Sequence, residues 1–407
     1  MPFDPGTRWN RFAVAAASFV GFTGFTLVMP FLPLYFQELG VDDVGEIALW
    51  SGLSLGVTPA LTAILAPVWG RLGDRFGLKI MVERSLLSFV VIMSATAFAT
   101  QAWHVLALRA VQGFFAGFGA LTLTMAAESA PKDRLAASIG AVQTAQRLGP
   151  ALGPVIGGTV AQIVGLRRAF LVAAGFYALA FLVVLFMYRE TDETRLRARS
   201  DAATAGRVTF RSVLAFQNFL LLMAAIFTLQ FIDRSFGPIL PLFVAQLGTP
   251  LGRVPVLSGI VFSIAAGAAA VGCHLSSRLL VHWSHRQVVA GAGGLAAVSV
   301  LAVGLTPNVT GLAVMTGVFG IGLGVAMTAA YSLAGLVIPA GARGAGFGVL
   351  TTASLSGIAL SPILSGVLGA TSIRAVFLLD AAGLAALTWF VARWMREVPS
   401  GSGATNG

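Results

Sequence analysis

The sequence predicts an all-α membrane protein in which twelve transmembrane helices form two pseudo-symmetric six-helix bundles. The first observation behind this prediction is composition. Of 407 residues, 57% are hydrophobic and only 10% are charged, a balance far outside that of soluble domains. The second is a series of apolar runs, each long enough to cross a bilayer, which takes about 20 residues. The third is a repeat, because the second half of the chain follows the pattern of the first.

The twelve apolar runs divide evenly between the two halves. The first follows Arg8 and Arg11 but is too long for a signal peptide and has no small-residue cleavage site, so we expect a retained helix. In chain order the predicted spans are residues 12–36, 47–69, 80–100, 103–128, 136–164, 169–189, 213–246, 255–278, 286–306, 310–335, 344–369 and 374–395.

The longest polar break separates the sixth run from the seventh. We therefore predict an N-terminal bundle at 1–189, a solvated cytoplasmic linker at 190–212, a C-terminal bundle at 213–396 and a disordered tail at 397–407.

The repeat is a tandem duplication, a known plan for transporters. Two segments match at a shift of 208 residues, 29–40 with 237–248 and 131–158 with 339–366. A third, 70–79 with 277–286, matches at 207. In the 131–158 segment the aligned pairs are Pro131 and Pro339, Gly140 and Gly348, Gly149 and Gly357, Pro154 and Pro362, and Gly158 and Gly366.

The basic residues predict the orientation, because cytoplasmic loops are enriched in Lys and Arg. With both termini inside, the cytoplasmic loops collect most of them, including six arginines between Arg189 and Arg211. The other side receives only Arg167, Arg168, Arg253 and Arg374. This asymmetry explains the net charge of +10 without nucleic-acid binding. The preference for Arg over Lys suggests a high-GC bacterium, and hence the bacterial inner membrane. The single cysteine, Cys273, excludes an intramolecular disulfide.

The loop between the second and third spans carries the sequence GRLGDRFGLK, at residues 70–79. It resembles the signature loop of the major facilitator superfamily and departs from it at Leu78, where that family usually has a basic residue. The resemblance implies that the aspartate contacts the N-terminus of helix 11 and stabilises one access state, and a helix N-terminus favours a carboxylate by ~0.3–1 kcal/mol. The residues that match are Gly70, Asp74, Arg75, Gly77 and Lys79.

The fifth span carries a glycine pattern that resembles the drug/proton antiporters of the same superfamily. Gly149, Gly153 and Gly157 recur every fourth residue, which forms a smooth ridge suited to close helix packing. Arg147 shares a different face with Gly140, Pro154 and Gly158. The resemblance implies that this helix meets helix 8 across the two halves. The matching residues are Gly140, Gly149, Gly153, Pro154, Gly157 and Gly158.

Two weaker patterns agree, so that the resemblance covers the chain except for its linker and tails. They are Arg109, Gln112 and Gly113 in the fourth span, and Gly24, Pro30 and Pro33 in the first.

Charged residues inside the predicted spans are few, and charges in a membrane are costly unless they are functional or paired. They are Arg109, Arg147, Asp233, Arg234 and Asp380. For all of them, a buried ion pair that locks helices together is the alternative to a functional role. We expect Arg147 and Arg109 to hold a carboxylate or a substrate oxygen, and Asp380 to face the outer side of its bundle or an interfacial arginine.

Asp233 is the candidate for proton coupling. It lies in the outer half of the seventh span, before an expected break at Pro238 and Pro241 where water can enter. Arg234 points ~100° away around the helix and so need not neutralise it. The competing account is a static pair of Asp233 with an arginine.

The expected function is proton-coupled export of small, largely apolar compounds by alternating access, in an antiporter that acts as a monomer in the lipid bilayer. A carrier for sugars or other polar metabolites and, more distantly, a membrane-embedded sensor or enzyme are the alternatives, because fold does not fix function. We expect no cofactor, no metal, no catalytic residue and no nucleic acid. The candidate cavity residues are Phe22, Phe25, Gln112, Gln143, Gln230, Phe231 and Phe236, with core or lipid packing as the alternative for the aromatic ones.

Overall fold

The computed structural model describes residues 5–128, 135–189, 218–338 and 343–397 of the chain. Within these ranges every regular element is a helix. The N-terminal half contains α1 (Pro5–Leu27), α2 (Leu32–Glu38), α3 (Val44–Phe76), α4 (Leu78–Ala97), α5 (Ala102–Phe115), α6 (Phe118–Glu128), α7 (Leu135–Val164) and α8 (Leu166–Met187). The C-terminal half contains α11 (Phe219–Gln246), the short η2 (Leu251–Arg253), α12 (Val254–His282), α13 (His285–Leu305), α14 (Val309–Val337), α15 (Arg343–Gly369) and α16 (Ile373–Trp394).

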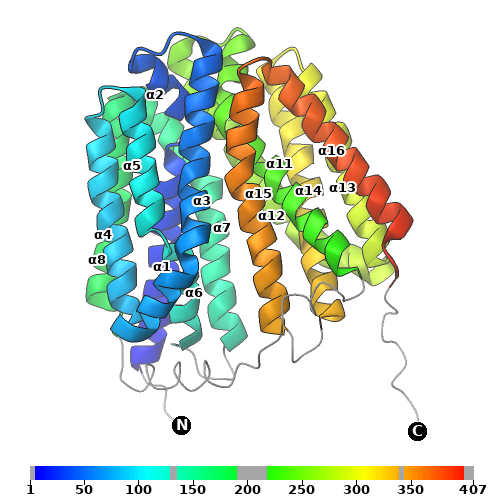
Figure 1. The fold of residues 1–407 in the computed structure, drawn as a ribbon, viewed down its shortest axis with the longest axis horizontal. Coiled ribbons are helices and arrows are strands. Elements are labelled where there is room, and N and C mark those ends of the chain that lie inside the picture. The colour runs from blue at the N-terminus through cyan, green and yellow to red at the C-terminus, as the bar shows by residue number, and fades with distance from the viewer. Residues whose placement is uncertain (1–4, 129–134, 190–217, 339–342, 398–407) are drawn as a thin grey trace.

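These helices form two upright bundles that stand side by side (Figure 1). The described helices include ten that are long and apolar enough to cross a membrane, and the bent pair α1–α2 makes an eleventh. Helix α7 adds a further 30-residue helix, which at 1.5 Å per residue is long enough to span. The prediction of an all-α membrane fold with twelve spans in two bundles of six is confirmed. The linker at 190–212 and the tail beyond residue 397 lie outside the described residues.

Two ends of the molecule can be distinguished. Helix α1 begins and α16 finishes at one end, which we call the terminal end; the loops at 39–43, 247–253 and 370–372 lie at the other, the distal end (Figure 1).

The duplication is visible as a repeated hydrogen-bond clamp at the terminal end. In the N-terminal bundle, Asn10 Nδ2 donates to the Arg189 carbonyl at 2.7 Å, and the Arg189 amide donates back to Asn10 Oδ1 at 2.9 Å. In the C-terminal bundle, Asn218 and Arg396 make the same two bonds at the same two distances. Each clamp joins the start of a bundle's first helix to the end of its last helix, so these two helices are held together at the terminal end.

The first span is broken, although the sequence predicted one continuous run at 12–36. Helix α1 ends at Leu27, α2 begins at Leu32, and their axes differ by 46°. Pro30 and Pro33 explain the break, since a proline lacks an amide donor and clashes with the preceding turn.

The predicted break at Pro238 and Pro241 is wrong, because α11 runs as one helix through both prolines. Every residue from Ser235 to Val244 is buried. Membrane helices tolerate interior prolines where neighbouring helices surround them. The same dense packing argues against water entry at this position.

The fourth span is also broken, between α5 and α6, and its free carbonyls are capped by side chains from other helices. Gly117 has φ +131°, a backbone conformation that favours glycine. Trp69 Nε1 donates to the Phe114 carbonyl at 2.7 Å. Arg84 Nη2 and Ser85 Oγ both donate to the Phe115 carbonyl at 2.9 Å, and the Arg84 guanidinium lies 3.5 Å from the centre of the Trp69 ring. A break inside a membrane requires such partners, because no lipid group can supply them.

Candidate functional site

The two bundles touch each other along two equivalent seams that are tightest in the distal half. One seam joins α7 to α12, and the other joins α3 to α15. Figure 1 shows α3 and α15 side by side near the distal end. The sequence repeat relates α7 to α15 and α3 to α12, so it converts one seam into the other. The contact between the bundles is therefore itself pseudo-symmetric.

Backbone packs on backbone where the seams are tightest. At the first seam the Pro154 carbonyl group lies against Gly259, and a Cβ added at Gly259 would lie 2.9 Å from the Pro154 carbonyl carbon. At the second the Pro362 carbonyl group lies against Gly52, where an added Cβ would lie 2.9 Å from the Gly366 Cα. These distances are shorter than real Cβ contacts, so only glycine fits at either position.

The glycine partners Gly52 and Gly259 were missed in the sequence. They are related by a shift of 207 residues, as Pro154 and Pro362 are by 208. That repeat was the signal that could have found them.

The glycine ridge of the fifth span contacts a different helix from the one expected. Gly149 and Gly153 pack on Thr23 of α1, and Gly157 packs on Leu27, with added Cβ atoms 2.8, 2.7 and 2.6 Å from the backbone of these residues. The expected meeting of this helix with helix 8, which is α12, does occur, but through another face of α7: the ridge itself holds α7 to α1 inside one bundle.

The opposite face of α7 makes the contact between the bundles. Gly158 packs on Pro255 of α12 beside the Pro154–Gly259 contact, and the Val155 amide donates to Ser263 Oγ at 3.2 Å. Gly140, which lies near the start of α7 at the terminal end, has no atom within 4 Å of an added Cβ.

The close glycine contacts between the bundles are concentrated towards the distal end. Between α3 and α15, the close glycine contacts reach from Gly45 and Ala370 down to Gly56 and Ala359, in the distal halves of the two helices and the loop that follows α15. The two bundles are therefore in close contact at the distal end, and we call this side shut.

A pocket of about 300 Å³ lies between the terminal halves of α11 and α15. We call it the α11–α15 pocket. Its lining is apolar apart from two hydroxyl groups. The lining residues are Met223, Ala224, Phe227, Val349, Thr352, Ala353 and Ser356.

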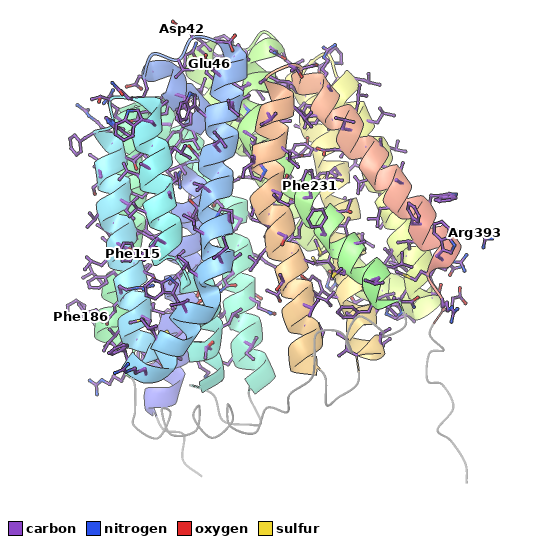
Figure 2. All side chains as sticks on the ribbon, in the orientation of Figure 1. Asp42, Glu46, Phe115, Phe186, Phe231 and Arg393 are labelled. Carbon is purple, nitrogen blue, oxygen red and sulfur yellow. The ribbon has the colours of Figure 1, made fainter. Side chains whose placement is uncertain are left out.

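Two of the predicted cavity residues border this pocket. The Phe231 ring lies 5.9 Å from that of Phe227, which lines the pocket, and Gln230 Nε2 donates to Ser354 Oγ of α15 at 2.9 Å. Phe231 lies midway along α11 (Figure 2). These two residues therefore lie on α11 between the pocket and the middle of the helix.

The other predicted cavity residues lie elsewhere. Phe22 packs on the Phe118 ring at 5.9 Å, Phe25 is half-buried and Gln143 is exposed. Phe236 and Gln112 are buried inside their bundles, at 3% and 0% exposure, and do not line a cavity in this arrangement. Phe236 instead stacks on Phe319 at 5.2 Å, because its face of α11 is turned into the C-terminal core.

Arg109 is buried inside the N-terminal bundle with no carboxylate beside it among the described residues. It is 3% exposed, and Nη1 donates to Gln112 Oε1 at 2.9 Å. Its Nε and Nη2 atoms have no hydrogen-bond partner in the described part of the chain. The expected contact with a substrate oxygen stays a prediction.

Asp233 and Arg234 form an ion pair with each other, Arg234 Nε lying 3.2 Å from Asp233 Oδ2. The expectation that Arg234 would face away from Asp233 is therefore wrong for this arrangement. Although the two Cα–Cβ bonds diverge around the helix, the longer arginine side chain reaches back. Both side chains are about 30% exposed, so the pair is in contact with its surroundings and is not sealed in the core.

Asp380 faces neither an arginine nor the outer side of its bundle. It is 5% exposed and accepts a hydrogen bond from Ser235 Oγ of α11. The expected interfacial arginine is absent from its described neighbours.

Arg147 reaches across the bundle interface. Its Nη1 lies 3.0 Å from the sulfur of Cys273 on α12, and no carboxylate pairs with it among the described residues. A thiol is a weak acceptor and leaves most of the guanidinium donors free. The expected contact of Arg147 with a carboxylate or a substrate oxygen therefore stays a prediction.

Replacing Arg147 with leucine, the residue at the repeat-related position 355, is expected to reduce the export rate by about tenfold, as loss of one charged hydrogen-bonding partner does. Arg147→Lys should keep partial activity, because it retains the charge but loses the planar fork. Transport assays on inserted protein would measure both. Cys273→Ala is the matched control for loss of the interface bond alone; normal export by Arg147→Leu would show that the residue has no transport role.

The signature loop is only partly described. The side chain of Asp74 lies outside the described residues, as do the side chains at the start of α15, so the expected contact of the aspartate with that helix stays a prediction. Gly77 ends α3 with φ +97°, and Lys79 Nζ donates to the Leu185 and Tyr188 carbonyls at 2.9 and 2.8 Å. The loop is thus fixed to the end of α8.

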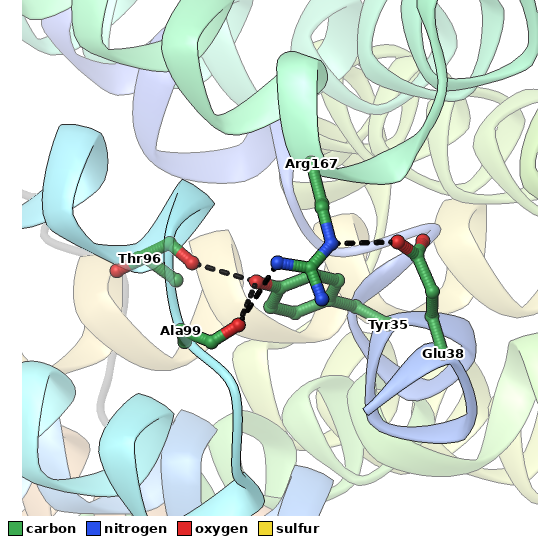
Figure 3. A network of polar contacts seen from close by, with 5 residues as sticks. All are labelled: Tyr35, Glu38, Thr96, Ala99 and Arg167. Carbon is green, nitrogen blue, oxygen red and sulfur yellow. Dashed lines mark hydrogen bonds and ion pairs between the residues drawn. The ribbon is translucent and has the colours of Figure 1, made fainter. Parts of the chain in front are cut away.

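A polar network at the distal end was not foreseen from the sequence (Figure 3). Arg167 at the start of α8 pairs with Glu38 of α2 at 2.9 Å and donates to the Ala99 carbonyl at 3.1 Å. Tyr35 donates to the Thr96 carbonyl at 2.7 Å. All five residues belong to the N-terminal bundle, so the network anchors the broken end of the first span within it.

The chain is similar to known transporters in sequence. The family model described as Major Facilitator Superfamily matches residues 14–328 and 277–407. Multidrug resistance protein MdtG of Proteus mirabilis (strain HI4320) is 33% identical over 273 residues, which are 66% of each chain. The multi-drug resistance efflux pump PmrA homolog of Lactococcus lactis subsp. lactis (strain IL1403) is 33% identical over 276 residues, 67% of this chain and 66% of that protein. The chain thus matches about two thirds of the length of these relatives.

Solved structures share the fold at lower sequence identity. A bacterial homolog of the human lysosomal transporter Spinster, in an inward-facing and unoccupied conformation, has a TM-score of 0.78 and 16% identity, covering 97% of this chain and 98% of that one. A D-xylose-proton symporter has a TM-score of 0.75 and 12% identity, covering 95% and 97%. With twelve spans in two repeat-related bundles, two symmetric seams between them and a family match along most of its length, this chain belongs to the major facilitator superfamily.

Proposed function

We propose that this protein is a secondary active exporter of small, largely apolar compounds, driven by proton entry. The observation that carries the proposal is the apolar α11–α15 pocket in a molecule whose bundles are sealed at the distal end. The two relatives reported above are named as multidrug resistance and efflux proteins, which supports the same substrate class. The pocket offers few polar groups to a sugar, and this disfavours the polar-metabolite alternative.

The proposed orientation places the terminal end in the cytoplasm of a bacterial cell, with the protein in the inner membrane. Basic residues are enriched at that end, as the positive-inside rule requires. Among the described residues they are Arg11, Arg75, Lys79, Arg84, Arg189, Arg278, Arg286, Arg393 and Arg396, against Arg167, Arg168, Arg253 and Arg374 at the distal end. In this orientation the distal seams form the outer gate, and the space between the two bundles is open to the cytoplasm.

In the proposed cycle, the bundles at 1–189 and 213–396 rock against each other as units of a monomer, joined by the linker at 190–212. The internal clamps at Asn10 and Asn218 support rigid-body motion, since each bundle is tied within itself. The distal seams would part and the opposite ends would close, as alternating access requires.

Asp233 is the proposed coupling carboxylate. Its ion pair with Arg234 is about 30% exposed and lies one turn from Gln230, beside the pocket. Protonation of Asp233 would cancel its charge and release Arg234, whereas a deprotonated Asp233 would hold it. Proton binding to this pair would therefore leave an unpaired positive charge on α11, the helix that borders the pocket.

An efflux-deficient bacterial host that expresses the protein tests this function. We expect higher minimal inhibitory concentrations for apolar toxic compounds, and energy-dependent loss of a fluorescent substrate from cells that a protonophore stops. A host with no resistance and no protonophore-sensitive efflux for any of a broad compound panel would contradict the proposal.

A further inference from the structure

A second carboxylate, Asp380, lies inside the C-terminal bundle in a setting very different from that of Asp233. It is on α16, seven residues from the start of that helix at the distal end. Its side chain points to α11, where the fully buried Ser235 hydroxyl donates to Oδ2. The contact therefore joins the last helix of the bundle to the helix that borders the α11–α15 pocket.

Among the residues that the structure describes, no charge on a neighbouring helix compensates Asp380. Helix α16 packs on α13, α11 and α15. The charged or titratable residues of these four helices are Asp233 and Arg234 on α11, His285 and Arg286 at the terminal end of α13, Arg343 at the terminal end of α15, and Arg374 and Arg393 on α16 itself.

None of these groups pairs with Asp380 within the described part of the chain. Arg234 is engaged by Asp233 at 3.2 Å. Arg374 is exposed and lies six residues away, about 240° around the helix and thus on another face. The basic groups of α13 and α15 lie at the opposite end of their helices.

The surroundings of Asp380 are apolar. The Phe377 ring, one turn before it on α16, packs on Phe236 at 5.3 Å and on Phe243 at 5.2 Å. An ionised carboxylate buried without a cation is strongly disfavoured, and such a group gives up its charge instead. A neutral carboxylic acid needs only hydrogen bonds, and Ser235 supplies one.

We propose that Asp380, bonded to Ser235 between α16 and α11, carries a proton when the distal side is shut and is a second proton-exchange site of the transport cycle. The step is an acid–base equilibrium: the carboxylic acid loses its proton to water that reaches the site when α11 and α16 separate locally around Asp380, while the clamp of Asn218 with Arg396 holds their terminal ends together, and the carboxylate regains a proton before the contact reforms. An ionised Asp380 side chain would be less stable in the apolar core than a protonated one. The protonation of Asp380 is therefore coupled to the position of α11 relative to α16. The transport role rests on the proposed function, whereas the protonated state does not.

Infrared difference spectroscopy of the purified protein in lipid tests the protonated state directly and needs no substrate. At neutral pH we expect the C=O stretching band of a protonated carboxylic acid, which ionised carboxylates lack. Asp380→Asn should remove the band, and Ser235→Ala should shift it by removing the hydrogen bond.

Two matched carboxylate variants are the controls. Asp42→Asn alters an exposed loop residue at the distal end, and Asp233→Asn alters the ion-paired carboxylate; both should keep the band. A wild-type protein without the band, or a band that persists in Asp380→Asn, would overturn the assignment.

The second arm measures transport in proteoliposomes under an imposed pH gradient. Asp380→Asn should lower gradient-driven transport by about tenfold, a usual size for coupling between two sites, and should flatten the pH dependence of the transport that is left. Asp42→Asn should behave as wild type. An inserted Asp380→Asn protein with the wild-type pH dependence would overturn the proton-exchange role. If wild-type protein shows no gradient-driven transport of any compound, the proposed function fails, while the infrared result still decides whether Asp380 is protonated.

Discussion

Replacing Gly52 with leucine is expected to abolish transport by preventing the distal side from closing. A side chain at this position would enter the space occupied by the Pro362 carbonyl group and the Gly366 Cα. Backbone atoms cannot move aside as a flexible side chain can, and overpacking a tight contact costs about 1–3 kcal/mol. A cost of that size shifts a two-state equilibrium by about 5- to 150-fold. The population should therefore move away from the distally shut arrangement.

Distances between spin labels at Asp43 and Thr371, in loops on either side of the α3–α15 seam, would measure this shift. We expect longer distances in Gly52→Leu than in wild type, together with loss of flux. Gly259→Leu should have the same effect, because it fills the repeat-related contact with Pro154.

A matched control is available in Gly175 of α8, where an added Cβ would meet no atom within 4 Å. Gly175→Leu introduces the same side chain into a membrane helix and should leave distances and flux unchanged. Short distal distances with wild-type flux in Gly52→Leu would refute the role of the seam as a gate.

Asp233→Asn is expected to stop transport against a concentration gradient while sparing part of the exchange down a gradient. The amide cannot take up or release a proton, so a pH gradient has nothing to act on at this site. It also leaves Arg234 without its partner at 3.2 Å. A loss of gradient-driven transport of about tenfold or more would match a coupling role.

Flux driven by a pH gradient and flux in substrate exchange, measured on the same proteoliposomes, separate the two accounts of Asp233. A proton carrier loses the first far more than the second, whereas a static structural partner loses insertion or both fluxes together. Asp42→Asn is again the control, since it removes a carboxylate that is exposed in a loop. Full gradient-driven transport by an inserted Asp233→Asn protein would eliminate the proposal.

The sequence by itself determined the architecture and the duplication. Apolar runs of bilayer length predict membrane-spanning helices, because a backbone in lipid must satisfy its own hydrogen bonds and a helix does so within one segment. The repeat of Pro154 at Pro362 then implied two equivalent bundles, which the superposable seams and the clamps at Asn10 and Asn218 bear out. The division of α7 into a glycine ridge and a separate face with Pro154 and Gly158 was also predicted, since helical periodicity fixes the angles between residues around one axis.

Only the tertiary structure decided which neighbour each face meets. The ridge at Gly153 contacts α1 and not α12, Asp380 faces Ser235 and not an arginine, and Arg234 turns back to Asp233. Pro30 and Pro33 accompany a broken span, yet Pro238 and Pro241 lie in an intact helix, because dense packing around α11 outweighs the local cost of proline. A sequence specifies the order of side chains around each helix, but the rotation of one helix against the next is set by all the contacts of the bundle at once.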